Sequence, residues 1–538
     1  MPTLTIDNQT VEAPDGATIL EAAQAAGIHI PTMCYLKGFA PSTSCMVCVV
    51  RVEGVKSLVP ACGAMAMDQM HVTTDSDEIR AARQAAIELL LSDHLGDCIG
   101  PCQMGCPAGM NIPLMLRHIA AGDDRAAIEV IKREIPLPAI LGRICPAPCE
   151  KVCRRAKIDQ AVSICRLKRF AADIDLDSGE PFMPVERSNK SKTVAIIGAG
   201  PCGLSAAYYL ACEGIACVVY DEHARPGGAV RYGPIDRKVL PIDVVERETG
   251  QLLKHNMTFQ PQQRIGKDVA FDTLCRDFDA VLVAAGDPML YDRNEFALDV
   301  KDDHIRVNRQ TYATSRKGVF AAGGAIGSRQ WAVRAVADGK EAARSIAAYL
   351  EGKPLVSKKP FNSRMGALSQ EEHKALLTTA NAEPRHEPDE PTAGLNNADA
   401  RAEARRCLHC DCRKAENCRL RDLASELNAR QNQWAGQRKT MRIDFGRDCV
   451  VYESGKCIQC GLCIQTARKA DETTGLAFVG RGFAMRIGVP FEKTLSEAIA
   501  RAGAECVANC PTGALAFDDP PQDTENQKQD TGNESFRQ

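Results

Sequence analysis

The chain has 538 residues, 25% of them charged, and a formal net charge of -3. That length allows about three to five domains, and the balanced charge provides no basic field for a nucleic acid or an acidic membrane surface. No apolar run approaches the roughly 18 residues that span a bilayer, and the N-terminus lacks the basic start and apolar core of a signal peptide. We therefore expect a cytoplasmic protein without membrane insertion.

The 25 cysteines are the unusual part of the composition. They could form disulfides or bind metals. A long cytoplasmic chain sits in a reducing compartment, which disfavours disulfides. The cysteines also occur in short-spaced groups, several followed by proline, which is typical of iron–sulfur ligands. The pattern favours metal binding.

Residues 1–76 alternate short β-like runs with one helix-like run and contain four cysteines spaced as C-x10-C-x2-C-x13-C. Zinc sites usually use two tight pairs, and this spacing has only one, so two irons fit it better. The segment resembles the N-terminal [2Fe–2S] domain of the large iron–sulfur subunit of complex I and of iron-only hydrogenases, which have a β-grasp fold. The predicted ligands are Cys34, Cys45, Cys48 and Cys62.

Residues 77–188 are predicted to form a helical domain with cysteine groups at both ends. It resembles the N-terminal domain of the glutamate synthase small subunit and of dihydropyrimidine dehydrogenase, where two [4Fe–4S] clusters take ligands from both groups. The resemblance implies two sets of three ligands. These are Cys98, Cys102 and Cys153 for one cluster, and Cys106, Cys145 and Cys149 for the other.

Each of these sets lacks a fourth ligand. For the first cluster, the family's first cysteine is absent and His94 precedes Cys98. An imidazole can replace a thiolate on iron, but His94 could equally be a surface residue of a helix. For the second cluster, Cys165 lies within a turn of the position where dihydropyrimidine dehydrogenase uses a glutamine. We prefer Cys165 to Lys168, because an ammonium group has no lone pair to offer.

Residues 189–352 open with a buried-strand run that leads into a GxGxxG turn and a helix, and a second strand then ends in Asp221. This arrangement is typical of a dinucleotide site, with the pyrophosphate at the helix N-terminus and the acid on the ribose. The segments that follow resemble the flavin-contacting stretches of the glutamate synthase small-subunit family, although that family usually has Asp in place of Gly324. The resemblance implies FAD bound by Gly198, Gly200, Pro201, Gly203, Asp221, Gly227, Gly228, Arg231, Gly286, Gly323 and Gly324.

A nicotinamide domain is missing from this Rossmann-like region. The resembling family inserts a complete NAD(P)H-binding domain between its last two flavin strands, whereas here only residues 288–317 separate them and no second GxGxxG occurs. One βαβ unit alone takes about 30 residues. The sequence therefore predicts a flavin domain that lacks the NAD(P)H domain.

Residues 353–400 are polar and rich in proline, and we predict a linker there. Residues 401–518 are predicted to be a C-terminal ferredoxin-like module that resembles a cluster module of the complex I large iron–sulfur subunit, and 519–538 a disordered tail. One tight group could hold a [4Fe–4S] cluster or zinc: Cys407, Cys410, Cys412 and Cys418. A CxxCxxC run with a later CP indicates a second [4Fe–4S] cluster: Cys457, Cys460, Cys463 and Cys510, with Cys506 left over.

These features predict a multidomain chain of mixed α/β and α+β class that carries FAD, one [2Fe–2S] and three to four [4Fe–4S] clusters. The main hypothesis is an electron-transfer subunit of an oxidoreductase complex. The resemblances imply as partners an NADH-oxidising flavin subunit like that of complex I, and a formate dehydrogenase, a hydrogenase or a similar reductase. Two alternatives stay open: a self-sufficient NAD(P)H-dependent reductase with a nicotinamide site near residues 287–304, and a non-catalytic adaptor with an empty flavin fold.

Overall fold

Two units make up the fold, and each is described by itself. The computed structural model describes residues 1–185, 187, 191–286, 296–327, 331–355, 360–378, 380–388, 390, 392–434, 436, 439 and 441–518. Unit 1 comprises Met1–Ile99, Lys359–Thr378 and Asp411–Gln538, and unit 2 comprises Gly100–Lys358 and Thr379–Cys410. The predicted tail, 519–538, lies outside the described residues.

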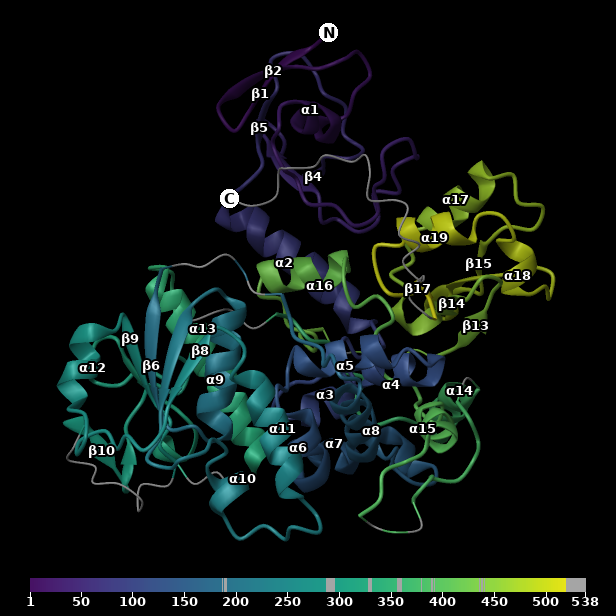
Figure 1. The fold of residues 1–538 in the computed structure, drawn as a ribbon. Coiled ribbons are helices and arrows are strands. Elements are labelled where there is room, and N and C mark those ends of the chain that lie inside the picture. Colours follow the sequence, from purple (N-terminus) through teal and green to yellow (C-terminus); the bar gives the residue numbers. More distant parts are fainter. Residues whose placement is uncertain are drawn as a thin grey trace. The chain divides into compact units, whose positions relative to one another are not determined.

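The N-terminal part of unit 1 is a five-stranded mixed sheet with strand order β2-β1-β5-β3-β4 (Figure 1). Its strands are β1 (Thr3–Ile6), β2 (Gln9–Glu12), β3 (Val49–Val52), β4 (Val59–Pro60) and β5 (His71–Thr73). Helix α1 (Ile19–Ala25) begins with a capping box in which Thr18 and Glu21 satisfy each other's backbone N–H groups. Its apolar residues share one buried core with β1, β3 and β5, as expected for a β-grasp.

The rest of unit 1 is built from short elements around cysteine loops. A three-stranded antiparallel sheet has the order β13-β14-β17. A second, two-stranded sheet pairs β15 with β16. The elements are α2 (Asp77–Ser92), α14 (Gln370–Leu377), α16 (Arg419–Glu426), β13 (Ile443–Phe445), β14 (Val450–Glu453), α17 (Leu462–Lys469), β15 (Ala477–Val479), β16 (Arg486–Gly488), α18 (Leu495–Ala498), α19 (Gly503–Asn509) and β17 (Leu515–Phe517).

Several of the helices in the helical part of unit 2 have a proline in their first turn. Proline suits the first turn of a helix because its missing N–H would have no partner there, and Pro101, Pro113, Pro138 and Pro148 occupy this position. The helices are α3 (Pro101–Gly105), α4 (Ile112–Ala121), α5 (Asp124–Lys132), α6 (Pro138–Ile144), α7 (Pro148–Lys151), α8 (Ile164–Asp177) and α15 (Asn397–Ala404).

A parallel five-stranded sheet, in the order β12-β9-β6-β7-β8, forms the other part of unit 2. Figure 1 shows α9 and α13 on one side of this sheet and α12 on the other. The elements are β6 (Thr193–Ile197), α9 (Pro201–Cys212), β7 (Ala216–Tyr220), α10 (Ala229–Tyr232), α11 (Ile242–Leu252), β8 (Met257–Gln260), α12 (Phe271–Asp277), β9 (Ala280–Val283), β10 (Val300–Lys301), β11 (His304–Ile305), β12 (Val319–Ala321) and α13 (Ala332–Leu350).

The compact units differ from the predicted chain-order domains in three places. Helix α2 belongs to unit 1 rather than to the helical cluster region, and residues up to Cys410 belong to unit 2 rather than to the C-terminal module. The predicted linker, 353–400, contains α14, whose N-terminus is capped by Ser369 and Glu372. In the part of the chain that the structure describes, no helix is long and apolar enough to cross a bilayer.

Candidate cysteine centres and dinucleotide turn

The four N-terminal cysteines lie together in unit 1. Cys34, Cys45, Cys48 and Cys62 are each 7% exposed or less, and each influences the ionisation of others in the set. A hydrogen bond from the Cys45 thiol lowers the pKa of Cys34 to about 5, helped by the backbone N–H groups of Cys45 and Ser44. The structure thus gathers the predicted [2Fe–2S] ligands in a loop whose N–H groups face sulfur, which suits bound thiolates.

A cavity in unit 2 gathers the four cysteines predicted for the second helical-domain cluster: Cys106, Cys145, Cys149 and Cys165. Lys168 lines the same cavity and is 4% exposed. Burial raises the pKa of Cys149 to about 12, whereas a hydrogen bond with Cys165 lowers the pKa of Cys145 to about 6. Burial tends to lower the pKa of Lys168, but the negative charge of the four cysteines outweighs it, so the pKa is raised.

A second cavity in unit 2 is lined by Cys102, Cys153, Cys407 and Cys410. This grouping differs from the prediction that Cys407 and Cys410 form one local site with Cys412 and Cys418, which belong to unit 1. It also separates Cys102 and Cys153 from Cys98. The tight spacing in sequence was misleading because the chain passes from one unit to the other at Cys410–Asp411. Burial raises the pKa of Cys410, and the neighbouring Arg154 acts in the opposite direction.

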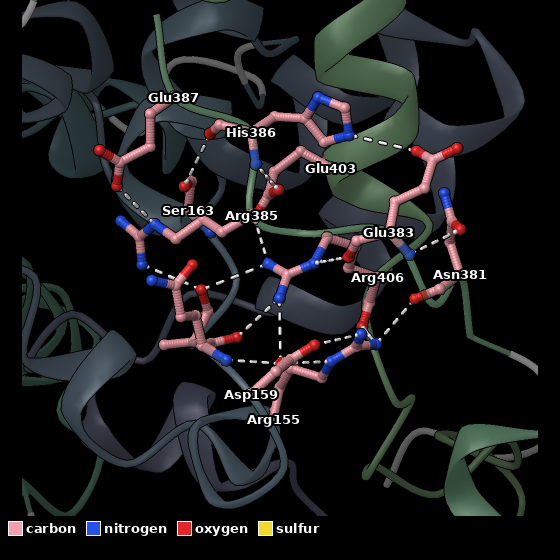
Figure 2. Close-up of polar contacts among 12 residues, drawn as sticks. Arg155, Asp159, Ser163, Asn381, Glu383, Arg385, His386, Glu387, Glu403 and Arg406 are labelled. Atoms are coloured by element: carbon pink, nitrogen blue, oxygen red, sulfur yellow. Dashed lines mark hydrogen bonds and ion pairs between the residues drawn. The ribbon is translucent and has the colours of Figure 1, made fainter.

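Residues 379–410 rejoin unit 2 after an excursion of the chain into unit 1, and we call them the returning segment. A buried network of charged side chains holds this segment in place (Figure 2). Arg406 is fully buried and pairs with Glu403 at 2.9 Å and with Asp159 at 3.0 Å. Arg155, 1% exposed, donates to the carbonyl oxygens of Arg406 at 3.0 Å and Asn381 at 2.9 Å. Because Arg406 immediately precedes Cys407 and Arg155 follows Cys153 by two residues, this network, the Arg155–Arg406 clamp, fixes two distant cysteine segments beside each other.

The carboxylate of Glu403 completes the clamp from the helix α15. It accepts the backbone N–H of Ser163 at 2.7 Å and that of His386 at 2.7 Å. Figure 2 shows Ser163 and His386 on either side of this carboxylate, and the neighbours of Ser163, Val162 and Ile164, line the cavity. Sequence reasoning missed Arg155, Glu403 and Arg406, because a charged residue in isolation is normally expected at the surface.

In unit 1, burial is the main reason that the pKa of Cys98 is raised to about 11. Cys412 and Cys418 are close enough to Cys98 to raise its pKa further. The N–H of Ser363 donates to the Cys98 sulfur at 3.4 Å. His94 has a buried Nδ1 atom for which the described residues supply no hydrogen-bond partner. Burial, and then the charge of Lys456, lower the pKa of His94 to about 4, so the ring is neutral at physiological pH.

The last predicted set also lines one cavity, again in unit 1: Cys457, Cys460, Cys463 and Cys510. Cys506 is fully buried but is not among the lining residues, and its sulfur donates to the carbonyl of Cys463 at 3.6 Å. Among the described residues no group of three or more His, Cys, Asp or Glu side chains is placed to hold a single metal ion. Four cysteines around a cavity instead match a cluster, in which each thiolate binds a different iron.

The dinucleotide turn follows β6 and depends on the glycines. A Cβ atom at Gly203 would lie 1.9 Å from the carbonyl oxygen of Gly198, and one at Gly228 (φ +49°) 2.7 Å from the Cα of Gly200. Pro201 begins α9. Asp221, 9% exposed, accepts the N–H of Ala199 at 2.7 Å. The carboxylate therefore braces the glycine turn at the end of the neighbouring strand.

The remaining residues that the sequence predicts to bind FAD follow Asp221 in the chain and lie around the same edge of the parallel sheet. Gly227 (φ +131°) and Gly323 (φ +68°) have backbone conformations that favour glycine. A Cβ atom at Gly324 would lie 2.7 Å from the carbonyl carbon of Gly286, which explains why the family's usual Asp cannot be placed there without moving the backbone. Arg231 is turned into the protein, donating to the carbonyl of Pro226 at 2.8 Å and pairing with Glu246 at 3.2 Å.

His223 is a residue of this region that the sequence did not single out. Its ring lies 2.8 Å from Asp221 through Nδ1 and stacks on Tyr232 with 4.1 Å between ring centroids. Its position two residues after the acidic strand end was the only available signal. The segment 287–295, part of the alternative nicotinamide site, lies outside the described residues, and β10 and β11 form a two-stranded hairpin just after it.

Three family models match parts of the chain. They are the 2Fe-2S iron-sulfur cluster binding domain over residues 1–77, dihydropyrimidine dehydrogenase domain II with its 4Fe-4S cluster over 94–180, and the NAD(P)-binding Rossmann-like domain over 196–245. The matches confirm the predicted resemblance: the chain combines a 2Fe-2S domain, a 4Fe-4S domain and a Rossmann-like domain.

Curated relatives are similar over about a third of the chain. It is 37% identical over 190 residues to the NADPH-Fe(3+) oxidoreductase subunit beta of Geobacter sulfurreducens, covering 35% of this chain and 28% of that protein. It is 35% identical over 207 residues to the NADP(+)-dependent formate dehydrogenase subunit beta of Moorella thermoacetica (35% and 29%), and 33% identical over 223 residues to the glutamate synthase [NADPH] small chain of Bacillus subtilis (41% and 45%). The chain spans less than half the length of these relatives.

Proposed function

We propose that the chain is an electron-transfer flavoprotein subunit of an oxidoreductase complex, carrying FAD, one [2Fe–2S] and four [4Fe–4S] clusters. The observation that carries this proposal is the gathering of nineteen cysteines into five separate groups. A flavin exchanges electrons in pairs and iron–sulfur clusters carry them singly, so such a chain would convert between the two. The chain's own residues would position the groups and set their potentials.

The ligand sets differ from the sequence prediction for two of the clusters. We assign one to Cys102, Cys153, Cys407 and Cys410, which line one cavity. Another is assigned to Cys98, Cys412 and Cys418, with His94 as its fourth ligand, because a neutral imidazole can bind iron and the buried Nδ1 atom has no hydrogen-bond partner among the described residues. The remaining [4Fe–4S] sets are those predicted from the sequence.

Contacts within each unit support a relay. In unit 1, Cys34, Cys45, Cys418 and Cys460 belong to one buried apolar cluster, and the Ser42 hydroxyl donates to the Cys460 carbonyl at 3.0 Å. In unit 2, Ile164 lines both cysteine cavities. Cysteine groups that share buried neighbours in this way would lie close enough together to favour one-electron transfer between them.

We propose FAD at the dinucleotide turn, with Asp221 toward the ribose and the glycines toward the pyrophosphate. Because no second GxGxxG occurs in the sequence, electrons would enter or leave through other subunits. The beta-subunit relatives support this assignment. By likeness to them, we propose as partners a subunit that oxidises NAD(P)H through its own flavin, and a formate dehydrogenase or similar reductase.

The test is anaerobic purification of the full chain followed by iron, sulfide and flavin analysis, with NADH and NADPH added afterwards. The proposal expects about 18 irons and one FAD per chain, and neither nucleotide bleaching the protein within an hour. Rapid bleaching by either nucleotide would instead identify a self-sufficient reductase. Absence of flavin from a chain with full iron would identify the adaptor. The Asp221→Ala variant should lose flavin while keeping its iron.

A further inference from the structure

Lys168 is a buried ammonium group that faces sulfur. It lies on α8, three residues after Cys165, and lines the cavity formed by Cys106, Cys145, Cys149 and Cys165 (the α8 cavity). Only 4% of the residue is exposed. The groups that interact with its charge are these four cysteines.

Other buried lysines of the described chain have a carboxylate partner. Lys132, also 4% exposed, pairs with Asp175 at 2.6 Å. Lys340 pairs with Glu134, and Lys456 pairs with Glu453. Within the described ranges no carboxylate forms an ion pair with Lys168. A charge removed from water costs several kcal/mol unless it is paired, so the cavity that Lys168 faces is suited to a negatively charged group.

We infer that Lys168 is the built-in counter-charge of the [4Fe–4S] cluster in the α8 cavity and raises its reduction potential. The inference rests on the proposed function. Reduction transfers one electron from the flavin or a neighbouring centre into the cavity and adds one negative charge. A fixed positive charge stabilises that more negative state, and the low-dielectric surroundings strengthen the effect. Lys168 is a positioning residue and binds no iron.

The experiment compares three variants of the full chain, purified anaerobically. Lys168→Met keeps much of the side-chain length and removes the charge, and Lys168→Arg keeps the charge. Lys151→Met is the matched control, because Lys151 lies two residues from Cys149 but is exposed to solvent, where its charge is screened. The readouts are iron content, flavin content and an EPR-monitored redox titration of each [4Fe–4S] signal.

We expect Lys168→Met to keep its iron and to lower one midpoint potential by about 59 mV or more, a tenfold change in a one-electron equilibrium. Lys168→Arg should shift the same midpoint potential by less than half as much, and Lys151→Met should leave every midpoint potential unchanged. Full iron with every potential unchanged in Lys168→Met would overturn the inference and leave the proposed function intact. Lys168→Met could instead lose about four irons. In that case, iron retained in Lys168→Arg would support the inference that the cluster needs the positive charge, and an equal loss in both variants would overturn the inference. A wild-type chain without clusters would overturn both proposals.

Discussion

The two cysteine cavities of unit 2 have similar chemistry but different construction. The α8 cavity takes all four cysteines from residues 106–165. The other, here called the clamped cavity, takes Cys102 and Cys153 from the same region but Cys407 and Cys410 from a segment that follows the whole parallel sheet. The first takes its cysteines from the ends of α3 and α6 and from α7 and α8. The second needs a device that brings back a distant segment.

That device is the Arg155–Arg406 clamp. Buried ion pairs add little net stability compared with apolar packing, but they are costly to break and they fix geometry. Arg406 satisfies this description, since it and Glu403 are both fully buried and both hold backbone groups of the neighbouring segment. The comparison teaches that a cavity whose cysteines are local takes its ligands from neighbouring helices, whereas a split cavity also needs long-range polar contacts to bring its ligands together, and these can be tested one at a time.

The largest effect should come from the ligands of the clamped cavity. Cys407→Ala and Cys153→Ala should each abolish the same EPR signal and remove about four irons, and the double variant should lose no more than either alone. Cys407→Ala combined with Cys418→Ala should lose two different signals. If Cys407→Ala and Cys418→Ala abolish the same signal, the local grouping predicted from the sequence is right and the clamped cavity is not a cluster site.

Breaking the clamp should have the next largest effect. Arg406→Met leaves Glu403 without the arginine it pairs with and takes one of two arginines from Asp159, which keeps Arg155, and removing one member of a buried pair costs about 3–5 kcal/mol. We expect the iron of the clamped cavity to be lost, with the signals of the α8 cavity and the flavin content retained. The control is Arg405→Met, because the Arg405 side chain is exposed and its hydrogen bond to the carbonyl of Ala120 is long, at 3.5 Å. Full iron content in Arg406→Met would show that the clamp is dispensable.

The contrast between the cavities also explains what the sequence could reveal. The strands and the glycine turn follow from local patterns such as GxGxxG after an apolar run, and the cysteines of the α8 cavity were implied by the resemblance to a known family. The partners of Cys407 could not be read in this way, because the crowding of Cys407, Cys410, Cys412 and Cys418 suggested one local site. The deciding contacts join residues more than 200 positions apart, and nothing in the spacing of an arginine indicates them.

Glu248 is the corresponding support for the α8 cavity. It is 3% exposed and accepts the N–H groups of Ala139 at 2.6 Å and Ile140 at 2.8 Å, at the start of the helix that ends at Cys145. Burial raises its pKa from 4.5 to about 7, although these N–H groups act in the opposite direction. Between about pH 4.5 and 7 the unfolded state has released a proton that the folded state still holds. The free energy of unfolding should therefore fall by about 3 kcal/mol as pH rises through this range.

Urea unfolding of the full-length apoprotein can measure this pH dependence for unit 2 separately from unit 1. The fluorescence of Trp331 reports on unit 2 when Trp434, the other tryptophan of the chain and part of unit 1, is replaced by Phe. Glu248→Gln stays neutral at every pH and should flatten the slope between pH 4.5 and 7. A slope equal to that of the parent protein would exclude Glu248 as its source.

The smallest expected effect tests whether the two cavities are independent. Arg385, on the returning segment, pairs with Glu150 at 3.1 Å, and the other oxygen of Glu150 accepts the N–H of Cys165 at 2.9 Å. A contact from the clamped side thus reaches a ligand of the α8 cavity. Both side chains are less than a fifth exposed, and Arg385 keeps a second, exposed partner in Glu387.

Arg385→Gln should therefore keep all its iron but slightly alter the EPR signal of the α8 cavity, because Glu150 is freed to shift the Cys165 backbone. The matched control is Glu387→Gln, which removes the exposed partner of Arg385 at 2.9 Å and leaves Glu150 in place. An altered signal in Arg385→Gln alone would show that closing the distant segment adjusts the local site. Identical spectra in both variants and the parent would mean that the two cavities, though they share Ile164, are built and tuned separately.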